Sequence, residues 1–187
     1  GTQANLTGAE AARLMLERSG VTHCRIEPVP GRLSDHYDPR DRTLRLSEPV
    51  YNARSISAIG VACHEAGHAL QHAQGYPWLK MRSALVPVTN IASKMSMPVL
   101  MVGMMLLSLA PVLGQWVVLV GVALFSAAVV FSVVTLPVEW DASARAKTAM
   151  VKAGIVTPQE AQGAARVLNA AFLTYLASAI ASIMTLI

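Results

Sequence analysis

The sequence predicts a mainly α-helical membrane protein with a small β element near its N-terminus. Hydrophobic residues make up 53% of the 187 residues and charged residues only 14%, a composition typical of membrane proteins. Uncharged runs occupy 97–113, 115–136 and 167–187, and the second is ample for one membrane crossing. A third observation is that helix caps and short strand patterns are confined to the more polar segment 1–54.

These observations predict one membrane-embedded domain over 1–187 with five parts in chain order. They are an N-terminal helix and small sheet in 1–54, a helix in 55–75 called the metal helix because it carries the potential metal ligands His64 and His68, a transmembrane hairpin in 86–136, a helix and connector in 137–166 that carry a further potential ligand, Glu139, and a C-terminal membrane helix in 167–187.

The N-terminal part begins with the capping box Thr7-Gly8-Ala9-Glu10, which predicts a helix that ends near Gly20. The segments 21–27 and 42–46 have the residue types of short strands. We expect them to form a small sheet over the metal helix. One of these strands is a candidate to receive an extended peptide by backbone pairing.

A dense group of polar side chains, Asp35-His36-Tyr37-Asp38-Pro39-Arg40, lies between the two predicted strands. His36 or Tyr37 could donate a hydrogen bond to an oxyanion that develops during catalysis, with His36 slightly favoured. The alternative is an Asx-type turn whose side chains stabilise only their own loop. The sequence leaves both interpretations open.

Two histidines and a glutamate stand in HExxH spacing on the predicted helix 55–75, which Ser55 or Ser57 would cap and Gly75 would end. His64 and His68 are four residues apart, so both imidazoles can reach one metal ion from the same helix face. Glu65 lies beside the open coordination position. This is a zincin-like site, in which Zn²⁺ lowers the pKa of a bound water and Glu65 accepts its proton as general base. The alternative is a helix whose two histidines only pack against neighbouring residues, but this would give Glu65 no role in a largely apolar helix.

The third metal ligand must come from elsewhere in the chain. Eight residues of helix rise roughly 12 Å, so His64 and His72 cannot share one ion, and His72 is expected in the second shell or at the surface. The carboxylates that follow the motif are Glu139, Asp141 and Glu160. Asp141 has Arg145 as an i+4 partner, and Glu160 closes the capping box of its own helix. Glu139 is the remaining candidate.

Glu139 follows Pro137, which we expect to end the apolar run and to open a new helix. The small residues Ala142 and Ala146 share the helix face of Glu139, so this face can press closely against the metal helix. The alternative is that Glu139 is only a favourable first-turn charge at a helix N-terminus.

The first two apolar runs form a tight hairpin, because only Gly114 and its neighbours separate them. Basic residues flank the hairpin at both feet: Lys80, Arg82, Lys94, Arg145, Lys147 and Lys152. The feet therefore face the cytoplasm, and the active site faces the cytoplasm at the membrane surface. The formal net charge of +4 suits anionic lipid headgroups. No nucleic-acid-binding motif is present, and Cys24 and Cys63 have no metal-ligand spacing.

At three places, in order along nearly the whole chain, the sequence resembles the membrane-embedded neutral zinc metallopeptidases of the YugP type. These are Leu33-Ser34-Asp35-His36-Tyr37-Asp38-Pro39, Ala62-Cys63-His64-Glu65-Ala66-Gly67-His68-Ala69 and Leu136-Pro137-Val138-Glu139-Trp140-Asp141-Ala142-Ser143. The resemblance implies peptidase activity, zinc ligands at His64, His68 and Glu139, a preceding membrane segment, and the plasma membrane of a prokaryote.

The order of metal helix, hairpin and ligand glutamate is also similar to HtpX-type and CAAX-prenyl proteases. Those proteases place an aspartate four residues beyond the glutamate, where this chain has Ser143. This departure argues against direct membership of those groups and against prenyl-peptide cleavage.

The sequence thus favours a zinc endopeptidase at the cytoplasmic membrane surface. Its expected partners are a protein or peptide substrate, which can itself be a membrane protein, the lipid bilayer, and a regulatory membrane partner. Two alternatives are a catalytically inactive adaptor whose zinc only ties helices together, and an intramembrane protease with the HExxH helix in lipid. The apolar stretch 56–63 is too short to span a membrane alone, which disfavours the second.

Overall fold

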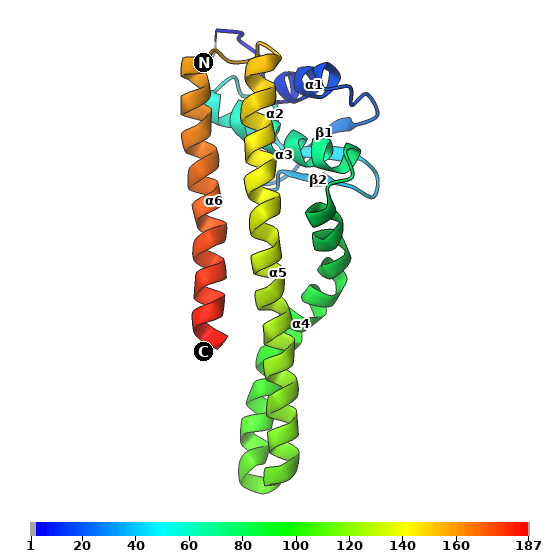
Figure 1. Cartoon of the computed structure of the whole chain (residues 1–187), viewed down its shortest axis with the longest axis vertical. Helices are drawn as coiled ribbons and strands as arrows, with labels where there is room; N and C mark the ends of the chain where they lie inside the picture. The colour runs from blue at the N-terminus through cyan, green and yellow to red at the C-terminus, as the bar shows by residue number, and fades with distance from the viewer. Residues whose placement is uncertain (1–2, 187) are drawn as a thin grey trace. The chain divides into compact units, whose positions relative to one another are not determined.

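The computed structural model describes residues 3–186, and the chain divides into two compact units that we describe separately. Unit 1 comprises Gly1–Leu79 and Val138–Leu173, and unit 2 comprises Lys80–Pro137 and Thr174–Ile187. The elements in chain order are α1 (Gly8–Arg18), β1 (Arg25–Val29), β2 (His36–Asp38), β3 (Thr43–Ser47), α2 (Glu48–Tyr51), α3 (Ile56–Ala73), α4 (Pro77–Leu109), α5 (Pro111–Lys152) and α6 (Pro158–Leu186) (Figure 1). The prediction of a mainly helical fold with a small sheet is confirmed.

In unit 1, α1 begins at the predicted capping box. The Thr7 backbone N–H donates to the Glu10 carboxylate at 2.8 Å, and the Glu10 N–H donates to the Thr7 hydroxyl at 3.2 Å. These two bonds satisfy N–H groups that a helix start otherwise leaves without an acceptor. Gly20 follows the helix with a φ of +79°, a left-handed conformation that favours glycine. The buried face of α1 packs on α3 in one hydrophobic core.

The sheet of unit 1 has three strands in the order β1-β3-β2. β3 is central, pairs in parallel with β1 and antiparallel with β2, and buries Leu44 and Leu46 in the core. Two strands were predicted close to β1 and β3, whereas β2 was not expected, because its residues His36–Asp38 carry no strand-like apolar pattern. Asp35 precedes β2 and accepts hydrogen bonds from the Ser47 backbone and hydroxyl, which fixes the start of β2 against the end of β3.

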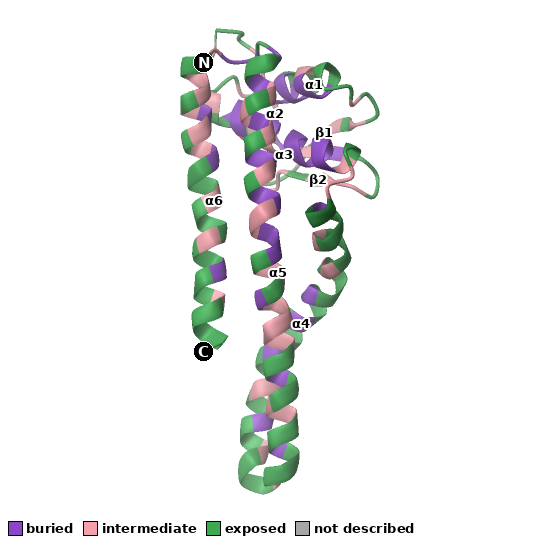
Figure 2. Cartoon of the chain, viewed as in Figure 1, coloured by how far each residue is buried: buried purple, intermediate pink, exposed green. Residues whose placement is uncertain are grey.

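The helix α3 forms the centre of unit 1. Ser55 is its N-cap, with its hydroxyl accepting from the Ala58 N–H at 3.2 Å, and Gly75 follows its end with a φ of +66°. Of the two predicted caps, the structure therefore selects Ser55. Burial along α3 is extensive (Figure 2), and Cys63 packs as a fully buried apolar residue, as expected.

Unit 2 contains the hairpin of α4 and α5, whose turn lies at Ala110 and not at Gly114 as predicted. Pro111 explains the shift, because its fixed φ and missing N–H favour the first position of a helix. Gly114 instead lies inside α5, where a Cβ atom would come within 2.5 Å of the Leu107 backbone nitrogen. Its lack of a side chain therefore allows the two hairpin helices to pack closely.

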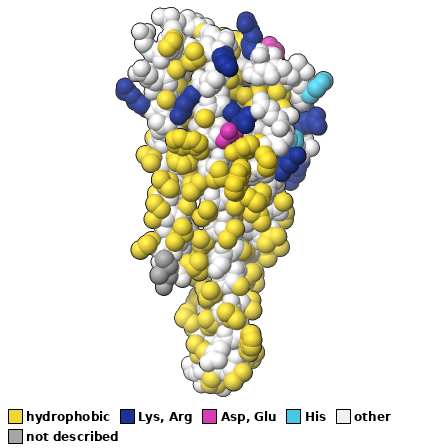
Figure 3. All heavy atoms as spheres, in the orientation of Figure 1, with side chains coloured by type: hydrophobic (Ala, Val, Ile, Leu, Met, Phe, Trp, Pro, Cys, Tyr) yellow, Lys and Arg dark blue, Asp and Glu magenta, His cyan; other side chains and the backbone are white. Residues whose placement is uncertain are grey.

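The helices α4, α5 and α6 are each long and apolar enough to cross a membrane. The described residues of unit 2 are mostly exposed (Figure 2), and Figure 3 shows hydrophobic side chains covering them. Contact between so many apolar side chains and water is unfavourable, whereas their contact with lipid is not, so this surface is suited to a membrane. The third predicted run is the C-terminal part of α6, except for Ile187, which lies outside the described residues.

Pro137 does not open a new helix, contrary to the prediction, because α5 continues through it to Lys152. Pro137 has no N–H to donate to the Val133 carbonyl, but an apolar helix tolerates one such missing bond. Glu139 therefore lies in a helix interior. The alternative interpretation of Glu139 as a first-turn charge at a helix N-terminus is wrong.

Candidate metal centre

Within unit 1, α3 and the part of α5 that follows Pro137 bring three candidate metal ligands together. His64 and His68 lie on α3, and Glu139 lies on α5. The Nε2 atom of His64 is 3.0 Å from one Glu139 carboxylate oxygen, and the Nε2 atom of His68 is 3.6 Å from the other. Potential ligand atoms of all three residues lie within 4.8 Å of one another. The Glu139 side chain is only 2% exposed, so a buried carboxylate faces two imidazoles in a setting with little solvent.

The donor set fits zinc. Two imidazole nitrogens and one carboxylate oxygen are the three protein ligands of a catalytic zinc site, which keeps one position for water. A structural site would be closed by a fourth protein ligand. Among residues 3–186, the group of histidine, cysteine, aspartate and glutamate side chains that meets here has only these three members.

Close contact between α3 and α5 makes this convergence possible. Ala142 and Ala146, the small residues on the Glu139 face, are fully buried, as the sequence predicted. Gly67 lies opposite them on α3, where a Cβ atom would come within 2.6 Å of the Ala142 carbonyl oxygen. The HExxH helix therefore needs a residue without a side chain between its two histidines.

We expect Gly67→Ala to weaken zinc binding and to lower the thermal stability of the protein. Alanine favours a helix interior by about 1 kcal/mol over glycine, but here the clash with the α5 backbone must separate the two helices. Zinc content after dialysis and the melting temperature are the measurements. Gly60→Ala is the matched control on α3, since its Cβ would meet Ala164 at an ordinary 3.7 Å. Equal behaviour of the two variants would contradict the tight contact.

The outer nitrogens of both histidine rings are also held by hydrogen bonds. The Nδ1 atom of His64 is 3.1 Å from the Ser143 hydroxyl, and the Nδ1 atom of His68 is 2.9 Å from the Gln71 side-chain oxygen. Both rings thereby turn Nε2 toward Glu139, the orientation that such second-shell bonds give to metal ligands. The sequence interpretation did not assign these roles to Gln71 and Ser143. Their spacing, three residues after His68 and four after Glu139, places each on the face of its ligand.

The other two candidate carboxylates are engaged as predicted. Asp141 accepts from the Arg145 guanidinium at 2.5 Å. Glu160 accepts from the backbone N–H of Thr157 at 2.8 Å in the capping box of α6, and also from the N–H of Gln3. Neither is a member of the group formed by His64, His68 and Glu139.

The candidate general base, Glu65, follows His64 on α3 and is partly exposed. A group that transfers protons to and from a substrate must be accessible to it, and the side chain of Glu65 meets this condition. The catalytic role of Glu65 remains a prediction.

The two candidate oxyanion donors lie on β2, outside the group of three. His36 is exposed, with its Nδ1 atom 2.7 Å from the Ser34 carbonyl oxygen. The Tyr37 hydroxyl is 2.8 Å from the Nδ1 atom of His72, one helical turn beyond His68. Burial, the largest cause, raises the pKa of Tyr37 to about 12, so the hydroxyl that is hydrogen-bonded to His72 is protonated at neutral pH.

His72 is therefore not a member of the group formed by His64, His68 and Glu139, as the sequence predicted. Together with Tyr37, Arg42 and Ala69 it lines a cavity of about 290 Å³. The expected Asx-type turn is also present, because Asp38 accepts from the Arg40 backbone N–H at 2.9 Å. The pKa of Asp38 is lowered to about 2, and the largest cause of this shift is hydrogen bonding with the Arg40 side chain.

Comparison with known proteins gives two matches. The family model described as "Putative neutral zinc metallopeptidase" matches residues 1–187. The "Putative membrane protease YugP" of Bacillus subtilis (strain 168) is 50% identical over 181 residues, which cover 97% of this chain and 78% of that protein. A comparison with solved structures finds no significant match.

Proposed function

Because the chain belongs to the family of putative neutral zinc metallopeptidases, we propose that it is an endopeptidase that hydrolyses peptide bonds at the cytoplasmic surface of the membrane. The convergence of His64, His68 and Glu139 is the observation that carries this proposal, and Glu65 directly follows His64 on α3. An adaptor with purely structural zinc would need a fourth protein ligand. The three ligands offered by the described residues instead suit a site that keeps a position for water.

In this proposal, His64, His68 and Glu139 hold the metal through two nitrogens and one oxygen. Zinc bound there would polarise the scissile carbonyl and lower the pKa of the attacking water. Glu65 accepts the proton of that water and later transfers it to the nitrogen of the leaving amine. His36 or Tyr37 donates a hydrogen bond to the developing oxyanion, and of the two, Tyr37 is hydrogen-bonded to α3 through His72.

An extended substrate can pair with β2. This strand is at an edge of the sheet, and it packs against α3, which carries both histidines. The cavity lined by Tyr37, Arg42, Ala69 and His72 adjoins the same strand and could accept a substrate side chain. These positions are consistent with a peptide that runs along β2 toward the metal ligands.

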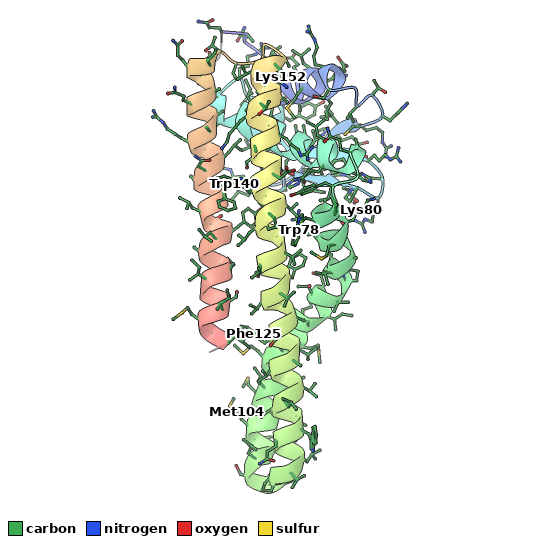
Figure 4. All side chains as sticks on the ribbon, in the orientation of Figure 1. Trp78, Lys80, Met104, Phe125, Trp140 and Lys152 are labelled. Carbon is green, nitrogen blue, oxygen red and sulfur yellow. The ribbon has the colours of Figure 1, made fainter. Side chains whose placement is uncertain are left out.

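Trp140 supports a site near the membrane surface. It directly follows Glu139 on α5 (Figure 4). It is 59% exposed and contacts the Phe172 ring with 5.2 Å between ring centroids. The Lys147 ammonium lies 5.9 Å from the centroid of the Trp140 ring. Exposed tryptophans flanked by lysines are typical of the membrane–water interface. An intramembrane site is less suited, because α3, which carries both histidines, is not among the candidate spans of residues 3–186, and Glu139 lies in α5 beyond its uncharged run 115–136.

Metal removal tests the activity. We expect purified protein in detergent to contain about one zinc ion per chain and to cleave an unfolded protein such as casein. A chelator should abolish cleavage, because the water then loses its activation, and stoichiometric zinc should restore it. Cleavage that survives complete zinc removal would reject the proposed mechanism.

The cytoplasmic orientation has its own test, in a Cys24→Ser background. We expect cysteine at the fully exposed Leu33 to react with a membrane-impermeant maleimide only after the cells are made permeable. Cysteine at Val112, in the exposed tip of the hairpin, should react in intact cells. The reverse pattern would place the metal ligands on the other side of the membrane.

A further inference from the structure

Gln71 is a fully buried polar side chain on α3 that the mechanism above does not use. We propose that Gln71, with Asp141, is a positioning residue that determines which nitrogen of His68 is presented to the metal. This inference rests on the proposed function only in taking His68 as a metal ligand. It concerns how the protein prepares that ligand before metal binds.

The neighbours of Gln71 allow only one orientation of its amide. Its Nε2 atom lies 2.8 Å from the Val138 carbonyl oxygen and 2.8 Å from an Asp141 carboxylate oxygen. Both oxygens can only accept hydrogen bonds, and the amide NH₂ group has two hydrogens to donate. The flipped orientation would place the amide oxygen against two other acceptors inside the protein, at a high cost in free energy.

The amide orientation in turn selects the tautomer of the neutral His68 ring. The Gln71 oxygen faces the His68 Nδ1 atom at 2.9 Å and can only accept, so Nδ1 must carry the hydrogen. Neutral imidazole then has its lone pair on Nε2, the atom that lies 3.6 Å from the Glu139 carboxylate. A metal ion requires this lone pair.

The same amide holds the segment that carries the third ligand. Val138 directly precedes Glu139, so the bond from Gln71 to the Val138 carbonyl ties α3 to α5 next to the metal group. Asp141 accepts a hydrogen bond from Arg145, whose cation also contacts the Gln74 side chain and the Tyr76 ring. Hydrogen bonds therefore connect Arg145 to Asp141, Asp141 to Gln71, and Gln71 to His68.

The test is the zinc dissociation constant of the full chain in detergent, measured by competition with a chelating dye. Gln71→Met keeps the side-chain length but makes no such hydrogen bonds, and we expect zinc affinity to fall about 10–100-fold, as for other second-shell substitutions. The visible absorption bands of the Co²⁺-substituted protein should shift as well, because the His68 ring is no longer held. Gln74→Met, at the C-cap of α3, changes a glutamine that is hydrogen-bonded to Arg145, and it should leave both readouts unchanged.

A double-mutant cycle tests whether Asp141 acts through Gln71. Asp141→Ala should weaken zinc binding by a smaller factor than Gln71→Met, because the Val138 carbonyl still orients the amide. In the Gln71→Met background it should have no further effect. Full additivity, or unchanged affinity and Co²⁺ spectrum in Gln71→Met, would overturn the proposal.

If circular dichroism shows that Gln71→Met has a lower helix content than the parent protein, the zinc affinity of Asp141→Ala becomes the test of the proposal. Weaker zinc binding with helix content retained supports the proposal, and unchanged binding overturns it. A parent protein that binds no zinc would instead reject the proposed function itself, so the two failures are distinguishable.

Discussion

Glu65→Gln should abolish peptide cleavage while leaving zinc bound. Glutamine has nearly the same size as glutamate but cannot accept a proton from the attacking water, and a general base contributes about 10²–10⁴-fold to the rate. Since Glu65 is not among the three residues that meet as candidate ligands, zinc content should stay near one ion per chain. The measurements are kcat on an unfolded protein substrate and metal content of the same preparation.

The matched control is Glu17→Gln, an exposed glutamate on α1 in the same unit. This variant should keep the activity of the parent protein. Full activity in Glu65→Gln would refute the proposed base, and loss of zinc in that variant would assign Glu65 to the metal group instead. Comparison of membrane proteomes from cells with the active protein and with Glu65→Gln would then identify the substrates.

Glu139→Ala should remove most zinc binding. The substitution takes away the one carboxylate that faces both His64 and His68, and it leaves a cavity in a buried site. We expect the loss of affinity to exceed the about 10–100-fold typical of second-shell substitutions, because a direct ligand is missing. Activity should fall with metal content and recover only partly at high zinc concentration.

Asp141→Ala is the comparison that separates a ligand from a neighbouring carboxylate. It should still bind one zinc ion per chain at micromolar zinc, although more weakly than the parent protein. Retention of full zinc affinity in Glu139→Ala, with a loss of zinc in Asp141→Ala, would transfer the ligand role from Glu139 to Asp141.

Local chemistry predicted the starts of α1 and α3 well. Thr7 and Ser55 accept hydrogen bonds from the helix N–H groups that their positions imply, and Gly20 and Gly75 adopt the left-handed conformation expected after a helix. These features depend on a few adjacent residues. They can therefore be predicted from the sequence alone.

Proline was harder to interpret, because its effect depends on the surroundings. Pro111 begins α5 as a first-turn proline should, and this signal was overlooked in favour of Gly114. Pro137 is in the interior of the same helix, where a long apolar run on its N-terminal side and packed alanines on the other maintain the helix. Sequence rules for soluble proteins favour a helix start there.

The structure brings the candidate ligands together as the sequence led us to expect, but their hydrogen-bond partners could not be predicted. The bonds from Gln71 to Val138 and from Ser143 to His64 join residues 67 and 79 positions apart. Such pairs depend on how two helices pack, and no local pattern encodes that packing. The strand β2 was missed for a similar reason, since only its pairing with β3 makes it a strand.

The order of the ligands along the chain has a consequence for biogenesis. His64 leaves the ribosome 75 residues before Glu139, and the apolar hairpin is synthesised between them. A nascent polypeptide therefore holds an incomplete zinc centre until the hairpin has been made. If the centre acts as proposed, it can activate water for hydrolysis only after the hairpin and Glu139 have been synthesised.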